Sequence, residues 1–275
     1  MSTNPIRYSE PYVLATGASA VRRLHVLHDI YSPAGKRILL EAGLTQGMKV
    51  ADFGCGVGVV AAMLAELVGP FGSVTGVDAD GAQIRQADAL CARKGLKNVR
   101  FLRADATRTG LPRASLDLVY CRFLLLHLPD PLACLQEMSA VLRPGGILVV
   151  EDGDLASATS MPPSAMDSFA ELFGRLGPVR GVNYSVANDL YHLALEAGFC
   201  DVHLEIHQPA ITRGENRFFL KWSVEEAGPA LIDAGILTST ELSQRLAEMQ
   251  AVIEDPHVVI LPPRMSQLRA RKPRN

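Results

Sequence analysis

The sequence predicts an α/β fold in which the strands of a largely parallel sheet alternate with helices. Two short apolar runs, residues 48–53 and 73–78, each end at or beside an acidic residue and precede a helical pattern. A glycine-rich turn joins the first run to its helix. This alternation of strand and helix is typical of a parallel sheet with helices on both faces. The 275 residues and 48% hydrophobic content suffice for one such domain with helical additions.

The stretch before the first strand, residues 8–44, is predicted to be helical. Val21, Leu24 and Leu27 fall at helical spacing, and Ser32-Pro33 is typical of the start of a second helix that ends at Gly43. We therefore expect an N-terminal helical cap at residues 1–45, ahead of a main domain at residues 46–275.

The first strand, residues 48–53, leads into the turn with alternating glycines and then into an apolar helix that begins at Val59. Gly54 and Gly56 permit a tight turn at a helix N-terminus, which is a usual cradle for a nucleotide-like ligand. A dinucleotide fingerprint has its third glycine where this chain has Val59. The pattern therefore argues against NAD as the bound cofactor.

The second strand ends at Asp78. A carboxylate at this place in Rossmann-like folds accepts hydrogen bonds from both hydroxyls of a ribose, so an adenosine without a 2′-phosphate is expected. Asp80 is predicted to cap the following helix, with Gln83 three residues later. Residues 98–102 are predicted to form the third strand.

The fourth strand, residues 115–121, is expected beside the first, so its end opens onto the cleft. Asp130-Pro131 begins a helix, and a fifth strand at residues 147–150 precedes the acidic cluster Glu151, Asp152 and Asp154.

Two later segments are predicted to be lids over the cleft. The first is an insertion near residues 155–182, and the second lies near residues 211–261. The second insertion contains an amphipathic helix that begins with a capping box, Thr238 and Glu241. Residues 184–197 read as a helix, and residues 200–208 and 265–271 as the last two strands.

Charge and cysteine content narrow the class of protein. The net charge of -2 provides no global positive field for nucleic acid or an anionic membrane. The five cysteines are scattered and none has C-x-x-C spacing. This pattern argues against a zinc ribbon and against a disulfide framework. No signal-peptide pattern or membrane-length apolar run is present, so a soluble, cytoplasmic protein is expected.

The order of these motifs resembles the class I S-adenosylmethionine-dependent methyltransferases, in the branch that acts on small molecules, including those of ubiquinone and menaquinone biosynthesis. The resemblance rests on the strand with G-x-G-x-G, on Asp78, on Asp105-Ala106, on the stretch 126–131 and on the turn 142–146. It implies a Rossmann-like seven-stranded sheet with six parallel strands and one antiparallel, helices on both faces and helical lid insertions. The implied cofactor is S-adenosylmethionine, with S-adenosylhomocysteine as product. The implied cofactor contacts are Asp52, Gly54, Gly56, Gly58, Asp78, Ala79, Asp105, Ala106 and Cys121.

Methyl transfer can require a base that removes a proton from the acceptor. By their positions in the chain, His127, Glu151 and Tyr12 are the catalytic candidates. The histidine in this motif is more often structural. The acidic cluster has three interpretations, namely a divalent-metal site, a counter-ion for a cationic substrate and a solvated loop, of which we expect the last and hence no metal.

The expected substrate is a small, largely apolar metabolite, methylated on carbon, nitrogen or oxygen and enclosed by the cap and the lids. Tyr8, Tyr12, His25, His28 and Tyr31 are candidate pocket residues. The alternatives are an enzyme of this fold that uses the bound cofactor for a cyclisation or decarboxylation, and an RNA or protein methyltransferase. A catalytically silent relative and a homodimer both remain open.

Overall fold

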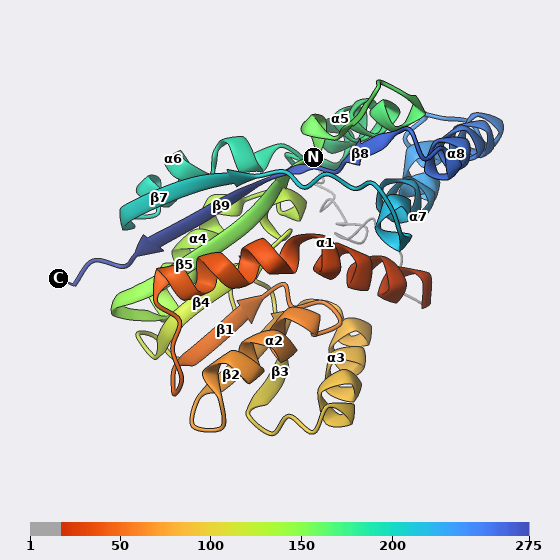
Figure 1. The fold of residues 1–275 in the computed structure, drawn as a ribbon. Helices are drawn as coiled ribbons and strands as arrows, with labels where there is room; N and C mark the ends of the chain where they lie inside the picture. Colours follow the sequence, from red (N-terminus) through yellow and green to blue (C-terminus); the bar gives the residue numbers. More distant parts are fainter. Residues whose placement is uncertain (1–17, 275) are drawn as a thin grey trace, which may run out of the picture.

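The computed structural model describes residues 18–274, and its centre is a seven-stranded sheet (Figure 1). The strand order is β3-β2-β1-β4-β5-β9-β7. β9 pairs antiparallel with both neighbours and the other pairings are parallel, so six strands share one direction, as predicted. The strands are β1 (Lys49–Phe53), β2 (Ser73–Asp78), β3 (Val99–Arg103), β4 (Leu116–Arg122), β5 (Leu142–Asp154), β7 (Cys200–His207) and β9 (Arg264–Arg271).

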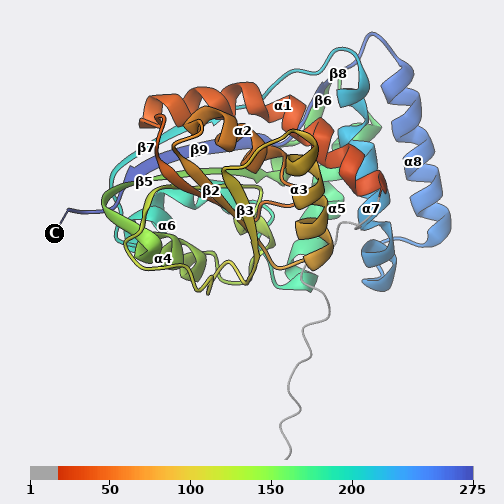
Figure 2. The same ribbon diagram turned by 90° about the horizontal axis from the view of Figure 1, so that it is seen from below.

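Helices cover both faces of this sheet, as Figure 2 shows from below. One face carries α1 (Ala18–Ala42), α2 (Val59–Val68) and α3 (Gly81–Arg93), and the other carries α4 (Pro131–Val141) and α6 (Leu190–Glu196). Successive side chains of a strand point to opposite faces. Leu118 and Tyr120 of β4 accordingly pack with α1 and α2, whereas Val119 and Cys121 pack with α4.

The prediction of two N-terminal helices is wrong for the described residues, because α1 is one helix that continues through Pro33. A proline inside a helix removes one hydrogen bond, to the carbonyl four residues earlier. Pro33 and Asp29 are exposed, so water can satisfy that carbonyl. Burial of Ile38 and Leu39 against the sheet, and of Ile30 against the lids, stabilises the helix on both sides of the proline.

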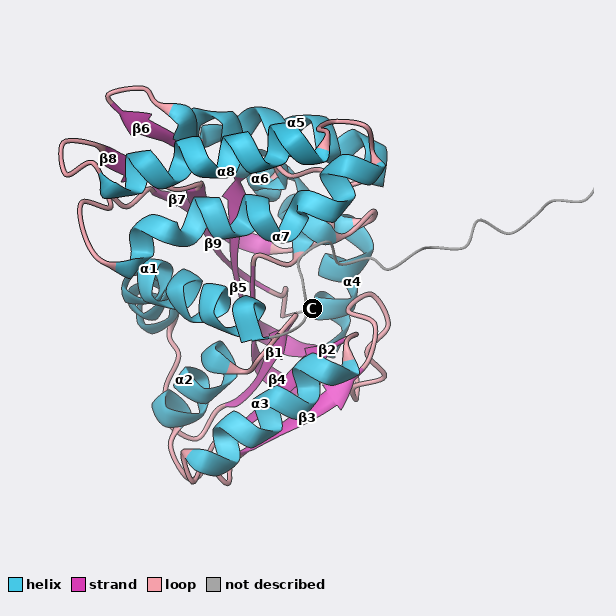
Figure 3. Cartoon of the chain, turned by 90° about the vertical axis from the view of Figure 1, so that its right-hand side faces the viewer, coloured by secondary structure: helices cyan, strands magenta, loops and turns pink. Residues whose placement is uncertain are grey.

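The two insertions form a single layer beyond the carboxyl ends of the central strands, which we call the lid layer (residues 155–182 and 211–261; Figure 3). It contains β6 (Thr159–Met161), α5 (Ser168–Arg180), α7 (Phe219–Asp233), α8 (Ser239–Glu254) and β8 (Val259–Leu261). β6 and β8 pair antiparallel and so join the insertions, while α7 packs against α1, α5 and α8. The predicted capping box of α8 is present, but neither the β6–β8 ribbon nor α7 was predicted.

Among the described helices, none combines the length and apolar character needed to cross a membrane.

Candidate active site

The glycine turn follows β1 and is fixed to the end of β2. Gly54, Gly56 and Gly58 all have positive φ, at 69°, 53° and 82°, a region that glycine enters without steric cost. The amides of Gly54 and Cys55 both donate to the carbonyl of Val77, at 2.8 and 3.0 Å. A Cβ on Gly58 would lie 2.7 Å from the Cβ of Ala87, so this glycine also allows α3 to approach the turn closely.

Asp78, at the end of β2, organises the same turn. One carboxylate oxygen accepts from the amide of Gly56 at 2.9 Å, and the other accepts from the amide of Asp80 at 2.9 Å. Burial raises the pKa of Asp78, while these backbone bonds oppose the rise. Each oxygen has a second lone pair that a ribose hydroxyl could use. Ala79 follows directly and is exposed.

The predicted adenine corner follows β3 as a tight local turn. Asp105 accepts hydrogen bonds from the amide and the hydroxyl of Thr107, at 2.7 and 2.8 Å, and its side chain lies at the surface. Ala106 is half-buried beside it. This arrangement leaves one oxygen of Asp105 at the surface of the corner.

A carboxyl group and a guanidinium group are buried where β1 and β4 lie side by side, at Asp52 and Arg122. Asp52 Oδ2 and Arg122 Nη1 are buried and have no hydrogen-bond partner within residues 18–274. The other terminal nitrogen of Arg122 lies 3.2 Å from Nδ1 of His28, which α1 supplies. Burial and the Arg122 charge lower the pKa of His28 to about 4, so the ring is neutral and can accept this hydrogen bond.

This pair of charges fits the methionyl end of S-adenosylmethionine, which carries an ammonium and a carboxylate. Buried polar atoms without partners are rare in folded proteins and indicate a missing partner. Asp52 would take the ammonium and Arg122 the carboxylate. The sequence analysis did not include Arg122 among the binding residues, because a lone arginine at a strand end carries no motif.

Cys121 lies in the core rather than in the cleft. It is fully buried and packs with the α4 face of the sheet, and burial raises its thiol pKa well above the usual range. Its side chain therefore has no thiolate character at neutral pH, so a cofactor contact at Cys121 would have to come from its backbone.

The three catalytic candidates have different surroundings. His127 ends the short 3-10 helix η1 (Leu125–His127) beside the ring of Tyr184, at a centroid distance of 6.0 Å. Burial lowers the His127 pKa to about 3, which makes the imidazole a weak base. Glu151 is fully buried beneath α1 and accepts hydrogen bonds from Tyr120 and Gln267. These contacts indicate a structural role. Tyr12 lies outside the described residues.

The expectation that the acidic cluster is a solvated loop is wrong. β5 extends to Asp154, so all three acids belong to the strand and are buried. Asp152 accepts from the amide of Leu125 at 2.7 Å, and burial raises its pKa to about 7. Asp154 pairs with Arg264 at 2.8 Å. Among the described residues, no group of three or more potential ligands is placed to hold a metal ion.

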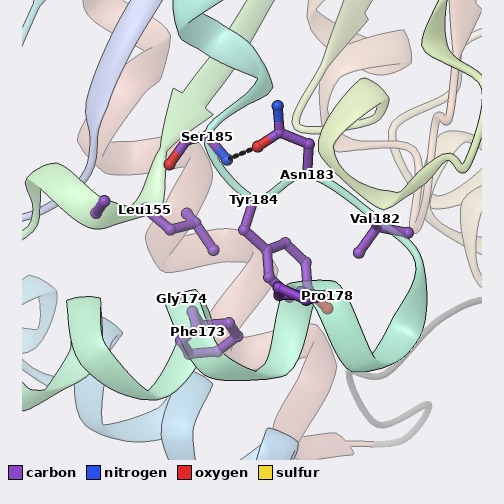
Figure 4. A pocket seen from close by; sticks show the side chains of 10 residues that line it. Leu155, Phe173, Gly174, Pro178, Val182, Asn183, Tyr184 and Ser185 are labelled. Atoms are coloured by element: carbon purple, nitrogen blue, oxygen red, sulfur yellow. Dashed lines mark hydrogen bonds between the residues drawn. The ribbon is translucent and has the colours of Figure 1, made fainter.

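A pocket of about 330 Å³ opens in the lid layer between α5 and the segment 182–185 (Figure 4). Phe173, Val182 and Tyr184 contribute apolar surface, and the Tyr184 ring packs edge-on against Phe173 at 5.5 Å. No predicted cofactor residue within the described chain lines it. A second pocket, of about 420 Å³, lies at the amino ends of β1, β2 and β3, away from the glycine turn.

Comparison with known proteins agrees with this geometry. The profile of a methyltransferase-domain family matches residues 44–196, more than half of the chain. The demethylmenaquinone methyltransferase of Staphylococcus aureus is 30% identical over 166 residues, which are 60% of this chain and 66%, just under two thirds, of that relative.

Solved structures with low identity show the same fold. A proposed methyltransferase of Bacillus halodurans has a TM-score of 0.62 at 21% identity, over 86% of this chain and 98% of that one. The [4+2]-cyclase SpnF has a TM-score of 0.53 at 19% identity, over 95% of this chain and 99% of that one. The fold alone therefore does not specify methylation.

The strand order and the glycine turn define the class I methyltransferase fold. The chain belongs to the methyltransferase-domain family. The resemblance drawn from the sequence motifs is thereby confirmed, and S-adenosylmethionine is the cofactor of that class.

Proposed function

We propose that the protein transfers the methyl group of S-adenosylmethionine to a small, largely apolar acceptor enclosed by α1 and the lid layer. The observation that carries this proposal is the buried pair Asp52 and Arg122, whose open polar atoms lie beside the glycine turn. The lid layer supports a small acceptor, because its two insertions are joined and packed against α1. A macromolecular substrate needs an open face around the methyl group.

The residues of the chain bind and orient both reactants. S-adenosylmethionine, when bound, supplies an electrophilic methyl group and a neutral thioether leaving group. Asp78 holds the ribose, Asp105 and Ala106 the adenine, and Asp52 and Arg122 the methionyl group. Alignment of the nucleophile with the carbon-sulfur bond supplies much of the rate. Neither His127, with a low pKa, nor Glu151, with both oxygens engaged, is favoured as a base.

We infer that the acceptor is a ring of the reduced-quinone type. The support is the name of the Staphylococcus aureus relative, a demethylmenaquinone methyltransferase, together with the apolar lining of the lid layer. The experiment incubates the protein and labelled S-adenosylmethionine with 1,4-dihydroxynaphthalene, and in parallel with an extract of the source cells. We expect label in a small apolar product that has gained one CH2. Label in RNA or protein, or a rearranged product of unchanged mass, would contradict the proposal.

Cofactor binding should release a proton from Asp52. Burial raises the pKa of this carboxyl to about 8, so in the free protein at pH 7 it is mostly protonated. The cofactor ammonium favours the carboxylate and lowers that pKa. Calorimetry of S-adenosylhomocysteine binding at pH 7, in buffers of different ionisation enthalpy, should report release of up to about one proton per site.

The release should fade above pH 8, where Asp52 is already ionised. Asp52→Asn is the matched control and should remove it. A binding enthalpy that does not vary with buffer would show that Asp52 does not contact the ammonium.

A further inference from the structure

Glu226 of α7 is a buried acid that no part of the proposed cofactor site uses. Its side chain is 5% exposed, and Oε2 accepts a hydrogen bond from Nε of Arg23 at 2.8 Å. Oε1 is also buried, and no partner for it exists in the part of the chain that the structure describes. Burial raises the pKa of Glu226, and the Arg23 charge opposes the rise.

Glu226 and Arg23 join α7 to the part of α1 that lies beside the glycine turn. On α1, Leu24 lies 3.9 Å from the position that a Cβ on Gly56 would occupy, and His28 lies against Arg122. Arg23 precedes Leu24 and is near enough to His127 to lower the pKa of that ring. α7 packs against this part of the molecule, between α1 and the layer of α5 and α8 (Figure 3).

A buried acceptor without a donor is costly, and more so when it is charged. Asp52 Oδ2 and Gln83 Oε1 are further buried acceptors without a partner in the described residues, and Arg122 Nη1 is a buried donor without one. Asp52 and Arg122 flank the proposed methionyl site. Glu226 Oε1 comes from the lid layer instead, which the proposed function places over the methyl acceptor. A donor on that second reactant, rather than on the cofactor, would pair with it.

We propose that Glu226 determines substrate specificity by accepting, at Oε1, a hydrogen bond from a hydroxyl group of the methyl acceptor. This inference rests on the proposed function and names the residue that recognises a hydroxyl group of its acceptor. Arg23 holds the carboxylate through Oε2 and leaves Oε1 for the ligand. A site built to pair with a hydroxyl rejects an analogue that lacks it, since the buried oxygen then stays unpaired.

The test compares two probes with the same ring, of which only the first has hydroxyl donors: 1,4-dihydroxynaphthalene under reducing conditions and 1,4-dimethoxynaphthalene. Binding of each to the complex with S-adenosylhomocysteine is measured for the native protein, for Glu226→Gln and for Glu225→Gln. The last variant is the matched control, because Glu225 is the exposed neighbour on the same helix. The native protein should prefer the diol about 10- to 100-fold. Glu226→Gln should lose most of that preference, and Glu225→Gln should keep it.

A purely structural Glu226 gives a different pattern. Glu226→Gln would then lower the melting temperature but leave the ratio of the two affinities unchanged, which would overturn the proposal. Equal affinities in the native protein, or binding of neither probe, would also overturn it. S-adenosylhomocysteine affinity and label transfer from the cell extract are measured separately, so that failure of the proposed function is distinguished from failure of this inference.

Discussion

Replacing Asp78 with alanine is expected to weaken S-adenosylhomocysteine binding about 100-fold or more. Two kinds of interaction disappear together. The proposed bonds to the ribose hydroxyls are charge-assisted, and each is worth about 1.5–3 kcal/mol. The amide of Gly56 also loses its 2.9 Å acceptor, so the glycine turn loses part of its preorganisation. Titration calorimetry measures the dissociation constant directly.

Asp80→Ala separates this effect from general damage to the same region. Asp80 caps α3 by accepting from the amide of Ala82 at 2.7 Å, and loss of a cap costs about 0.5–2 kcal/mol of stability. We expect Asp80→Ala to lower the melting temperature and leave the affinity nearly unchanged. An affinity unaltered in Asp78→Ala would show that the ribose binds elsewhere.

Arg217→Met should destabilise the lid layer by about 3–5 kcal/mol, an effect large enough to unfold it locally. The guanidinium of Arg217 is buried, and the methionine retains most of the apolar stem while it removes every donor. Five backbone carbonyls would lose the hydrogen bond that Arg217 donates, those of Thr212, Val252, Ile253, Asp255 and Val258, at 2.7 to 3.2 Å. They belong to the start of the second insertion, the end of α8 and the approach to β8.

Hydrogen exchange resolves this loss by segment, and urea unfolding gives its free energy. Amides at the end of α8 and in β8 should exchange faster, while those of β1 and β4 should not change. Arg213→Met removes an exposed arginine from the same segment and should have little effect. Protection in α8 that survives Arg217→Met would mean that helix packing alone holds the lid.

The sheet could be predicted from sequence because its signals are local. The apolar runs that became β1 and β2 carry their own turns and helices, so both strand positions and the glycine turn followed from short windows. The acidic cluster could not be interpreted in that way. Asp152 and Asp154 are satisfied by the amide of Leu125 and by Arg264, which lie 27 and 110 residues away along the chain.

The same limit explains why Glu226 and the β6–β8 ribbon were not predicted. In the sequence, Glu226 is one of two adjacent acids on an amphipathic helix, and nothing distinguishes it from Glu225. Only its contact with Arg23, 203 residues away, shows that it is buried. β6 and β8 have three residues each, too short for a period-two pattern to distinguish a strand. The candidate cofactor residues followed from a resemblance, whereas the lid-side residue required three-dimensional contacts.

The pairing of β6 with β8 couples the two insertions, so that they have to change together in evolution. Ser160 and Ile260 face each other across it and are both buried, so a change on one side has to be matched on the other. A chimera that received the first insertion from a relative and kept the second would break this pairing. On the proposed roles of the lid layer and Glu226, exchange of acceptor preference between members of the family requires that both segments, and the stretch of α1 that carries Arg23, be transplanted together.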